Sequence, residues 1–190
     1  MKHFVDMLKD SSISLKRENI STLQVNMGKL CNQACSHCHV EAGPKRSEIM
    51  NIEVISQIIN LLKRENNIKV VDITGGAPEL NNHFKYFLKE LKKLNFHVID
   101  RCNLTVLHEK GQENTPEFLA NNNIEIVASL PCYTEENVDK QRGKGVFSKS
   151  IDSLKMLNKL GYGKGNDLLK LNLLYNPLGD FLAPEQNKLE

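Results

Sequence analysis

The feature that most constrains the fold is a regular alternation of short, β-branched or apolar runs with longer stretches of helical spacing. The clearest helical stretch places five apolar residues on one face, from Phe84 to Leu94, with lysines turned to solvent. Short runs bounded by turn-forming residues predict strands between the helices. The predicted strands are residues 22–27, 69–74, 97–100, 124–129 and 168–175, and the predicted helices are 3–9, 52–66, 84–94, a short one with Thr115 as N-cap and Pro116 at its first position, and 150–161.

The spacing of these runs predicts an α/β fold with a parallel sheet and helices outside it. The five strands lie within residues 22–175, at about 31 residues per strand and helix, which matches a βαβ unit. A closed eight-stranded barrel needs about 250 residues, so we expect either an open, partial barrel or a doubly wound sheet. We expect an N-terminal helix and connector at 1–21, a core at 22–182 and a tail at 183–190.

Composition and charge exclude several classes of protein. The 25 basic and 23 acidic residues give a net charge of +2, too small for a nucleic-acid-binding surface. No stretch approaches the length of a membrane span, and the first residues lack the apolar core of a signal peptide. We therefore expect a cytoplasmic protein without a membrane or nucleic-acid partner.

Residues suited to chemistry follow all five predicted strands. Because ligands of parallel α/β sheets bind at the carboxyl ends of the strands, these segments converge on one site. They are the cysteine-rich segment 31–38, then 74–79, 101–103, 129–133 and 176–177.

The sharpest motif is the spacing C-x3-C-x2-C formed by Cys31, Cys35 and Cys38. Three thiolates on one loop suit an iron-sulfur cluster or zinc, and a structural site usually takes four protein ligands. Three cysteines holding a four-iron cluster would leave one iron open for a substrate or cofactor. The alternative is zinc, completed by His37, His39 or a distant residue.

This motif, placed after the first strand of a βα series, resembles the radical S-adenosylmethionine (SAM) superfamily. The resemblance narrows to the arsenosugar-biosynthesis radical SAM family, also described as radical SAM/Cys-rich proteins. Five stretches carry it, from about residue 22 to 182: residues 23–44, 72–80, 100–105, 129–133 and 141–147.

The resemblance implies a partial (β/α)6 barrel with a [4Fe-4S] cluster on the three cysteines and SAM on its open iron. It implies that His37 lies near the adenine and that the Gly75-Gly76 turn receives the methionine amine. Ala77 stands where the superfamily usually has an acid, and Glu79 comes two residues later, so the group that meets the amine stays open. The residues we assign to SAM are His37, Gly75, Gly76, Ala77, Asn103 and Ser129.

The resemblance also implies a reaction, in which the 5′-deoxyadenosyl group of SAM is transferred to a methylated trivalent arsenical, with a ferredoxin or flavodoxin as electron donor. Trivalent arsenic is soft and prefers thiolates. We therefore expect Cys102 and Cys132 to face the mouth of the barrel and to hold or guide the arsenical. Tyr133 is a further substrate candidate, and Arg142, on a basic loop, either clamps an oxyanion or is solvated.

Three alternatives stay open at this point. The cysteines could hold zinc in a binding module, or a radical SAM enzyme could act on a peptide or a thiol metabolite. The family also continues with a sixth strand and a Cys-rich region beyond the last residue of this chain. We therefore expect a C-terminally truncated barrel with an unprotected sheet edge, and an inactive chain is the third alternative.

Overall fold

The protein, seen as a computed structural model that describes residues 3–16, 18–176 and 185, is built on a five-stranded parallel sheet. The strands follow one another in sequence order across the sheet, and each neighbouring pair is parallel. The strands are β1 (Thr22–Asn26), β2 (Val70–Thr74), β3 (His97–Asp100), β4 (Glu125–Ser129) and β5 (Leu171–Leu174). This order confirms the predicted α/β fold.

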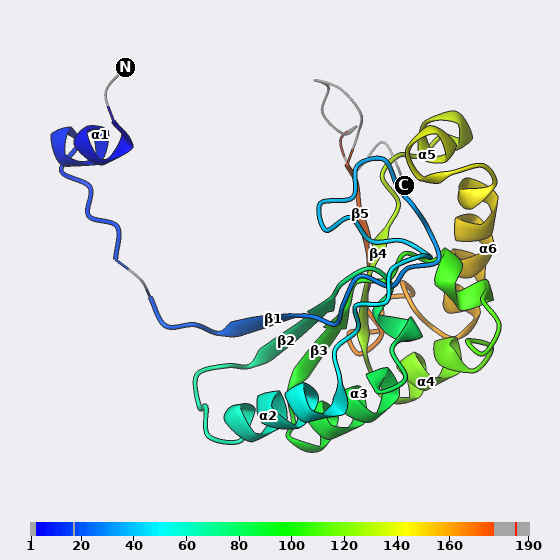
Figure 1. Cartoon of the computed structure of the whole chain (residues 1–190), viewed down its shortest axis with the longest axis horizontal. Coiled ribbons are helices and arrows are strands. Elements are labelled where there is room, and N and C mark those ends of the chain that lie inside the picture. Colours follow the sequence, from blue (N-terminus) through cyan, green and yellow to red (C-terminus); the bar gives the residue numbers. More distant parts are fainter. Residues whose placement is uncertain (1–2, 17, 177–184, 186–190) are drawn as a thin grey trace.

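Helices connect successive strands and lie along the outer side of the curved sheet (Figure 1). Their apolar stripes make the contact: α3 buries Phe84, Phe87, Leu88 and Leu91, as its periodicity predicts. The α-helices are α1 (Phe4–Asp10), α2 (Ile52–Leu62), α3 (Phe84–Lys93), α4 (Thr115–Asn121), α5 (Glu135–Arg142) and α6 (Val146–Lys159), with 3-10 turns η1 (Pro78–Leu80) and η2 (Thr105–His108).

The main core lies between the sheet and these helices. Val71, Ile73, Val98 and Ile126 on the central strands are fully buried. The largest fully buried side chain is Tyr162, whose hydroxyl donates a hydrogen bond of 2.7 Å to the Ile124 carbonyl. A buried core of this size gives the carboxyl ends of the strands a rigid base.

Several predicted boundaries are wrong, for local reasons. The last strand begins at Leu171 rather than at 168, because the Asn166 side chain accepts the Leu168 N–H at 2.9 Å and forms a turn there. The N-cap of α4 is Asn114, and Thr115 is its first helical residue. Helix α2 ends at Leu62, and α6 begins at Val146.

Helix α5 was missing from the sequence prediction. Its eight residues include a single apolar side chain, Val138, so no apolar periodicity marks it. The segment is instead held by tertiary contacts, since Val138, Gln141 and Arg142 are all buried. Apolar spacing does not reveal a helix that buries polar side chains.

The N-terminal helix α1 lies apart from the sheet, at the end of an extended segment (Figure 1). None of its residues is buried. The expected tail at 183–190, apart from residue 185, and the end of the expected core at 177–182 lie outside the described residues. In the part of the chain that the structure describes, no helix combines the length and the apolar character that a membrane span requires.

Candidate cofactor site

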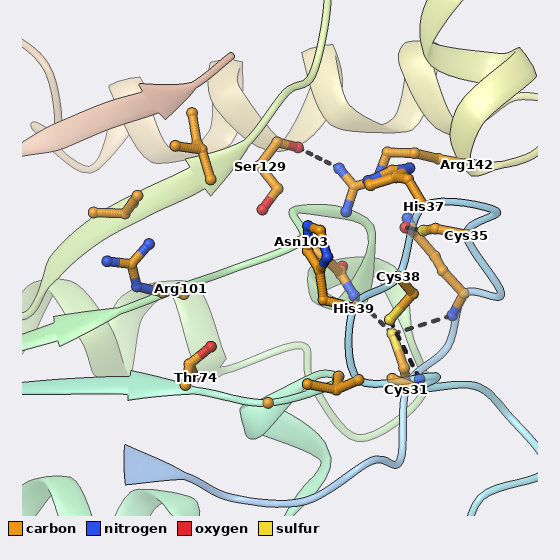
Figure 2. A pocket seen from close by; sticks show the side chains of 17 residues that line it. Cys31, Cys35, His37, Cys38, His39, Thr74, Arg101, Asn103, Ser129 and Arg142 are labelled. Carbon is orange, nitrogen blue, oxygen red and sulfur yellow. Dashed lines mark hydrogen bonds between the residues drawn. The ribbon is translucent and has the colours of Figure 1, made fainter. Parts of the chain in front are cut away.

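A cavity of about 260 Å³ opens at the carboxyl ends of the strands. It is lined by residues that follow β1, β2, β3 and β4, as the predicted convergence requires, and by Leu174 of β5. Figure 2 shows the cysteines, His37 and Arg142 gathered on one side, with Thr74 and Arg101 on the other. The lining consists of Cys31, Gln33, Cys35, His37, Cys38, His39, Val40, Ala42, Thr74, Gly75, Gly76, Arg101, Asn103, Val127, Ser129, Arg142 and Leu174.

All three clustered cysteines are free thiols and line this cavity. The loop points N–H groups at their sulfurs: Gln33 N–H lies 3.4 Å from Cys31 Sγ, and Ala42 N–H lies 3.3 Å from Cys38 Sγ. Burial raises the pKa of the Cys31 thiol, and the hydrogen bond from Gln33 opposes that shift. Donors directed at sulfur stabilise metal-bound thiolates, so the loop suits a metal or an iron-sulfur cluster.

The Gly75-Gly76 turn packs against the backbone that leads into the cysteine loop. Gly76 N–H donates to the Gly28 carbonyl at 2.9 Å, and Ala77 N–H donates to the Leu30 carbonyl at 2.8 Å. A Cβ atom on Gly76 would lie 2.4 Å from the Leu30 oxygen, and Gly75 has a φ of +144°. Glycine is therefore required here by close approach and backbone conformation, and both residues border the cavity.

Ala77 does not line the cavity. It is 3% exposed and belongs to the main core, so its assignment to SAM has no geometric support. Glu79 does not take the place of the missing acid either, because it is also buried and lies outside the lining. The described lining residues include no carboxylate. Glycine has no side-chain acceptor, so any acceptor that the Gly75-Gly76 turn supplies to the cavity is a backbone carbonyl.

Arg142 lies at the end of α5 rather than on a loop and is 7% exposed, so of its two expected roles the solvated one is wrong. The structure instead brings it into the cavity, where its Nη1 donates to the Ser129 carbonyl (Figure 2). Its buried Nε has no hydrogen-bond partner among the described residues. His37 Nδ1 is also buried without a hydrogen-bond partner among the described residues. Burial and the nearby positive charge of Arg142 lower the pKa of His37. Two residues that line a cavity without acids thus each hold a buried nitrogen without a partner, which favours a ligand with anionic or acceptor groups.

Asn103 and Ser129 both border the cavity, as expected from their positions after β3 and β4. Asn103 Nδ2 lies 3.5 Å from Cys31 Sγ and donates to Asn32 Oδ1 at 2.8 Å. Its own Oδ1 accepts the Val106 N–H at 2.9 Å, which holds the side chain. Asn103 therefore joins the end of β3 to the cysteine loop.

The structure does not bring Cys102 to the mouth of the barrel. Cys102 is fully buried beside Glu79 and Asp100, and the expectation that it faces the cavity is wrong. The alternation of side chains along an extended segment turns it away from the face that presents Asn103.

Cys132 and Tyr133 lie outside the cavity lining, on the loop between β4 and α5, and Cys132 is buried, so the expectation that Cys132 faces the mouth of the barrel is also wrong. Burial raises the pKa of the Cys132 thiol, but hydrogen bonds from Thr134 and Asn137 outweigh burial and bring it below its ordinary value. The ring of Tyr133 packs against Tyr175 at a centroid distance of 5.2 Å. Cys132 is thus the more acidic of the two isolated thiols.

Arg101 lies in the segment 101–103 that the sequence predicts to converge on the site, although the sequence assigns it no role. Its guanidinium donates two hydrogen bonds of 2.8 Å to the two carboxylate oxygens of Asp72. Gln33 and Thr74 likewise lie in the predicted segments 31–38 and 74–79 without a predicted role. Val127 and Leu174 lie within predicted strands and were missed as lining residues.

Comparisons with known proteins agree with this geometry. A probable GTP 3′,8-cyclase of Pyrococcus horikoshii is 27% identical over 158 residues, covering 82% of this chain and 47% of that protein. The putative peptide biosynthesis protein YydG of Bacillus subtilis is 30% identical over 73 residues, covering 38% of this chain and 22% of YydG. The chain therefore spans about half the length, or less, of these curated relatives.

Among solved structures, Streptococcus suis SuiB superposes with a TM-score of 0.64 at 19% identity, covering 89% of this chain and 35% of SuiB. The structure of anSMEcpe with bound AdoMet (SAM) and a peptide gives a TM-score of 0.63 at 22% identity, covering 82% of this chain and 42% of anSMEcpe. These likenesses confirm the fold as a partial, TIM-barrel-like domain. The family model of the radical SAM superfamily matches residues 25–175, so this chain belongs to the radical SAM superfamily.

Proposed function

We propose that this chain is the catalytic core of a radical SAM enzyme, with a [4Fe-4S] cluster and SAM as its cofactors. The observation that carries the proposal is the placement of three free thiols from one loop on a cavity that the glycine turn also lines. A purely structural zinc site would use four protein ligands and would not need an open cavity beside it.

The residues present fit these cofactors. Cys31, Cys35 and Cys38 would hold the cluster, with N–H donors already directed at two of the sulfurs. Carbonyls of the Gly75-Gly76 turn would accept hydrogen bonds from the methionine amine. When bound, the reduced cluster and SAM supply one-electron cleavage of a sulfonium carbon–sulfur bond.

The remaining cavity residues bind and orient SAM. Arg142 presents a guanidinium with an unsatisfied Nε, which suits the SAM carboxylate. Ser129 and Asn103 offer hydroxyl and amide groups at the ends of β4 and β3. His37 adjoins Cys38, where its ring can lie against the adenine. Bound SAM would lie against these walls, which would shield the reacting carbon from unwanted hydrogen donors.

The substrate that we propose is a methylated trivalent arsenical, to which the 5′-deoxyadenosyl group is added. Support comes from the five sequence blocks that resemble the arsenosugar-biosynthesis family. The lowered pKa of the Cys132 thiol favours the thiolate that soft arsenic prefers, but Cys132 is 6% exposed and lies outside the cavity lining, so its position adds no support. Cys102 is withdrawn as an arsenic ligand because it is fully buried. A ferredoxin or flavodoxin would supply the electron.

A second candidate substrate is a peptide. SuiB has been solved bound to the precursor peptide SuiA, and anSMEcpe with the Cp18Cys peptide. The cavity here is open at the carboxyl edge of the sheet, and a peptide could reach it from that side.

The first experiment is anaerobic reconstitution of the chain with iron and sulfide, followed by electron paramagnetic resonance of the reduced protein. We expect a four-iron signal that changes when SAM is added. A Cys38→Ala variant should lose the signal, whereas Cys132→Ser should keep it. Stoichiometric zinc with no iron signal would contradict the proposal.

Substrate choice is tested on the same reconstituted protein. Incubation with SAM, reductant and dimethylarsinous acid should give an adenosylated arsenical, detected by mass spectrometry. Cleavage of SAM without arsenic–carbon bond formation, together with modification of a supplied peptide, would support the second candidate instead.

A further inference from the structure

A second cluster of potential metal ligands lies in the core, separate from the cysteine loop. Glu79 of η1, Asp100 at the end of β3 and Cys102 just beyond it each offer a ligand atom, and these atoms lie within 4.8 Å of one another. The three residues are 3%, 0% and 0% exposed. None of them lines the cofactor cavity.

Within the described part of the chain, the carboxylates of this cluster receive no hydrogen bond from outside it other than one from the backbone of Glu79 itself. Glu79 hydrogen-bonds to the Cys102 thiol and to Asp100, and all four carboxylate oxygens of the pair are buried without a further partner among the described residues. The guanidinium of Arg101 is held by Asp72, and the Tyr162 hydroxyl donates to the Ile124 carbonyl. Buried charges are normally paired or bound to a metal, because transfer of a lone carboxylate from water is very costly. These two side chains therefore require either shared protons or a cation.

The donor set favours one class of cation. Two carboxylates alone would suit a hard ion such as Mg²⁺ or Ca²⁺, but those ions need six or more oxygen ligands, including water. A thiolate beside the carboxylates selects a softer ion with lower coordination, above all Zn²⁺. Leu104 N–H donates to Cys102 Sγ at 3.2 Å, the kind of outer contact that supports a metal-bound thiolate.

We propose that Glu79, Asp100 and Cys102 bind one divalent transition-metal ion inside the core, zinc by the chemistry of the donor set, with one carboxylate supplying both of its oxygens so that four protein donor atoms meet the ion. The ion would join η1, which follows the Gly75-Gly76 turn, to the end of β3 and the segment after it, which carries Asn103. It would thus brace two of the segments that border the cofactor cavity. This site shares no residue with the cysteine loop. The chain would therefore bind the zinc ion whether or not the iron-sulfur cluster is present.

The test uses the full chain with four of its five cysteines replaced, Cys31→Ala, Cys35→Ala, Cys38→Ala and Cys132→Ser. Cys102 is then the last thiol. After dialysis against dilute zinc and then buffer, elemental analysis should find close to one zinc per chain. Titration with Co²⁺ should produce a sulfur-to-cobalt charge-transfer band, which only Cys102 can supply in this variant.

The matched controls are Cys102→Ser, which should abolish the charge-transfer band, and Glu79→Gln, which should release the zinc. Because these variants could fail to fold, the four-cysteine variant alone decides the question. A folded chain, by circular dichroism, that retains no zinc and gives no charge-transfer band overturns the proposal and leaves a proton-sharing carboxyl pair. This test uses no iron, SAM or turnover, so its failure is distinguishable from failure of the radical SAM activity.

Discussion

At the scale of single residues, Arg142 shows how a helix end prepares a ligand site. The side chain is almost completely buried, and its Nη1 donates to the Ser129 carbonyl. Its Nε has no partner among the described residues. A buried guanidinium with donors to spare costs free energy unless a ligand accepts from it. We therefore expect Arg142 to act through SAM binding rather than through the cluster.

Replacement of Arg142 by Ala should weaken SAM binding about 10- to 100-fold, since a hydrogen bond to a charged group contributes about 1.5 to 3 kcal/mol. The measurement is a titration of SAM into the reduced, reconstituted protein, followed by electron paramagnetic resonance. The signal without SAM should be unchanged.

The matched control is Lys140→Ala, which removes an exposed positive charge from the same helix. It should leave SAM affinity within about twofold, because an exposed charge contributes little. Equal losses in the two variants would mean that Arg142 acts only through net charge.

Cys102 and Cys132 show what the sequence could and could not predict at this scale. The chain position of both, each just after a strand, was read correctly. The local path of the backbone decides on which face of the segment each side chain lies. An isolated cysteine in the sequence gives no information about that path. It was easier to predict where the three clustered cysteines lie, because their spacing on one loop restricts Cys31, Cys35 and Cys38 to a common site whatever path the loop takes.

At the scale of elements, the central arrangement is the contact between the Gly75-Gly76 turn and the backbone before Cys31. Two hydrogen bonds join these segments, from Gly76 N–H and Ala77 N–H. The sequence marked both segments as part of the site but did not show that they touch. Their contact is made by backbone atoms, so side-chain chemistry gives no sign of it beyond the two glycines.

The change Gly76→Ala should destabilise the protein by about 3 kcal/mol and reduce incorporation of iron, because the new Cβ would lie 2.4 Å from the Leu30 carbonyl oxygen. Denaturant unfolding measures the first effect, and iron content after reconstitution measures the second.

Gly43→Ala is the comparison variant, since its Cβ would meet nothing closer than the Gln33 carbonyl at 3.9 Å. It should unfold at nearly the same denaturant concentration as the unchanged protein. If Gly76→Ala were as stable as Gly43→Ala, the close packing of the turn would not limit this position.

Helix α5, which carries Arg142, is the helix that could not be predicted from the sequence. Strands and helices with apolar periodicity were predicted because the apolar residues that they bury in the core recur in the sequence at helix or strand spacing. Helix α5 instead packs by buried polar groups, including Gln141, whose backbone carbonyl accepts the Ser36 N–H at 3.1 Å. This contact also ties the cysteine loop to α5.

At the scale of the whole molecule, the sheet has two open edges within the described residues, at β1 and at β5. Strand β5 exposes Leu173 at 42% and Leu174 at 46%, and Leu174 also borders the cofactor cavity. In the described part of the sheet, strand β5 pairs with β4 on one side only, and an edge strand with exposed leucines favours association with another strand.

For this chain of 190 residues, we expect concentration-dependent self-association through β5. The change Leu173→Lys should reduce it, because a charged side chain on an edge strand opposes pairing with another edge. Sedimentation velocity over a range of protein concentrations measures the effect.

The control is Leu168→Lys, which alters a leucine that is 63% exposed but lies in the turn before the strand. It should leave association unchanged. Equal reduction by both changes would assign the association to general hydrophobicity rather than to the strand edge.

The backbone contacts around the cysteine loop also bear on how tightly a cofactor can be held. Cys31 N–H donates to the Gly43 carbonyl, Gly43 N–H to the Lys29 carbonyl, and Ser36 N–H to the Gln141 carbonyl. These bonds order the loop through the polypeptide alone. The conformational entropy of the loop is then lost during folding rather than during assembly of the site. Binding free energy is not spent on ordering the loop, so a preorganised site of this kind combines high affinity with rapid loading.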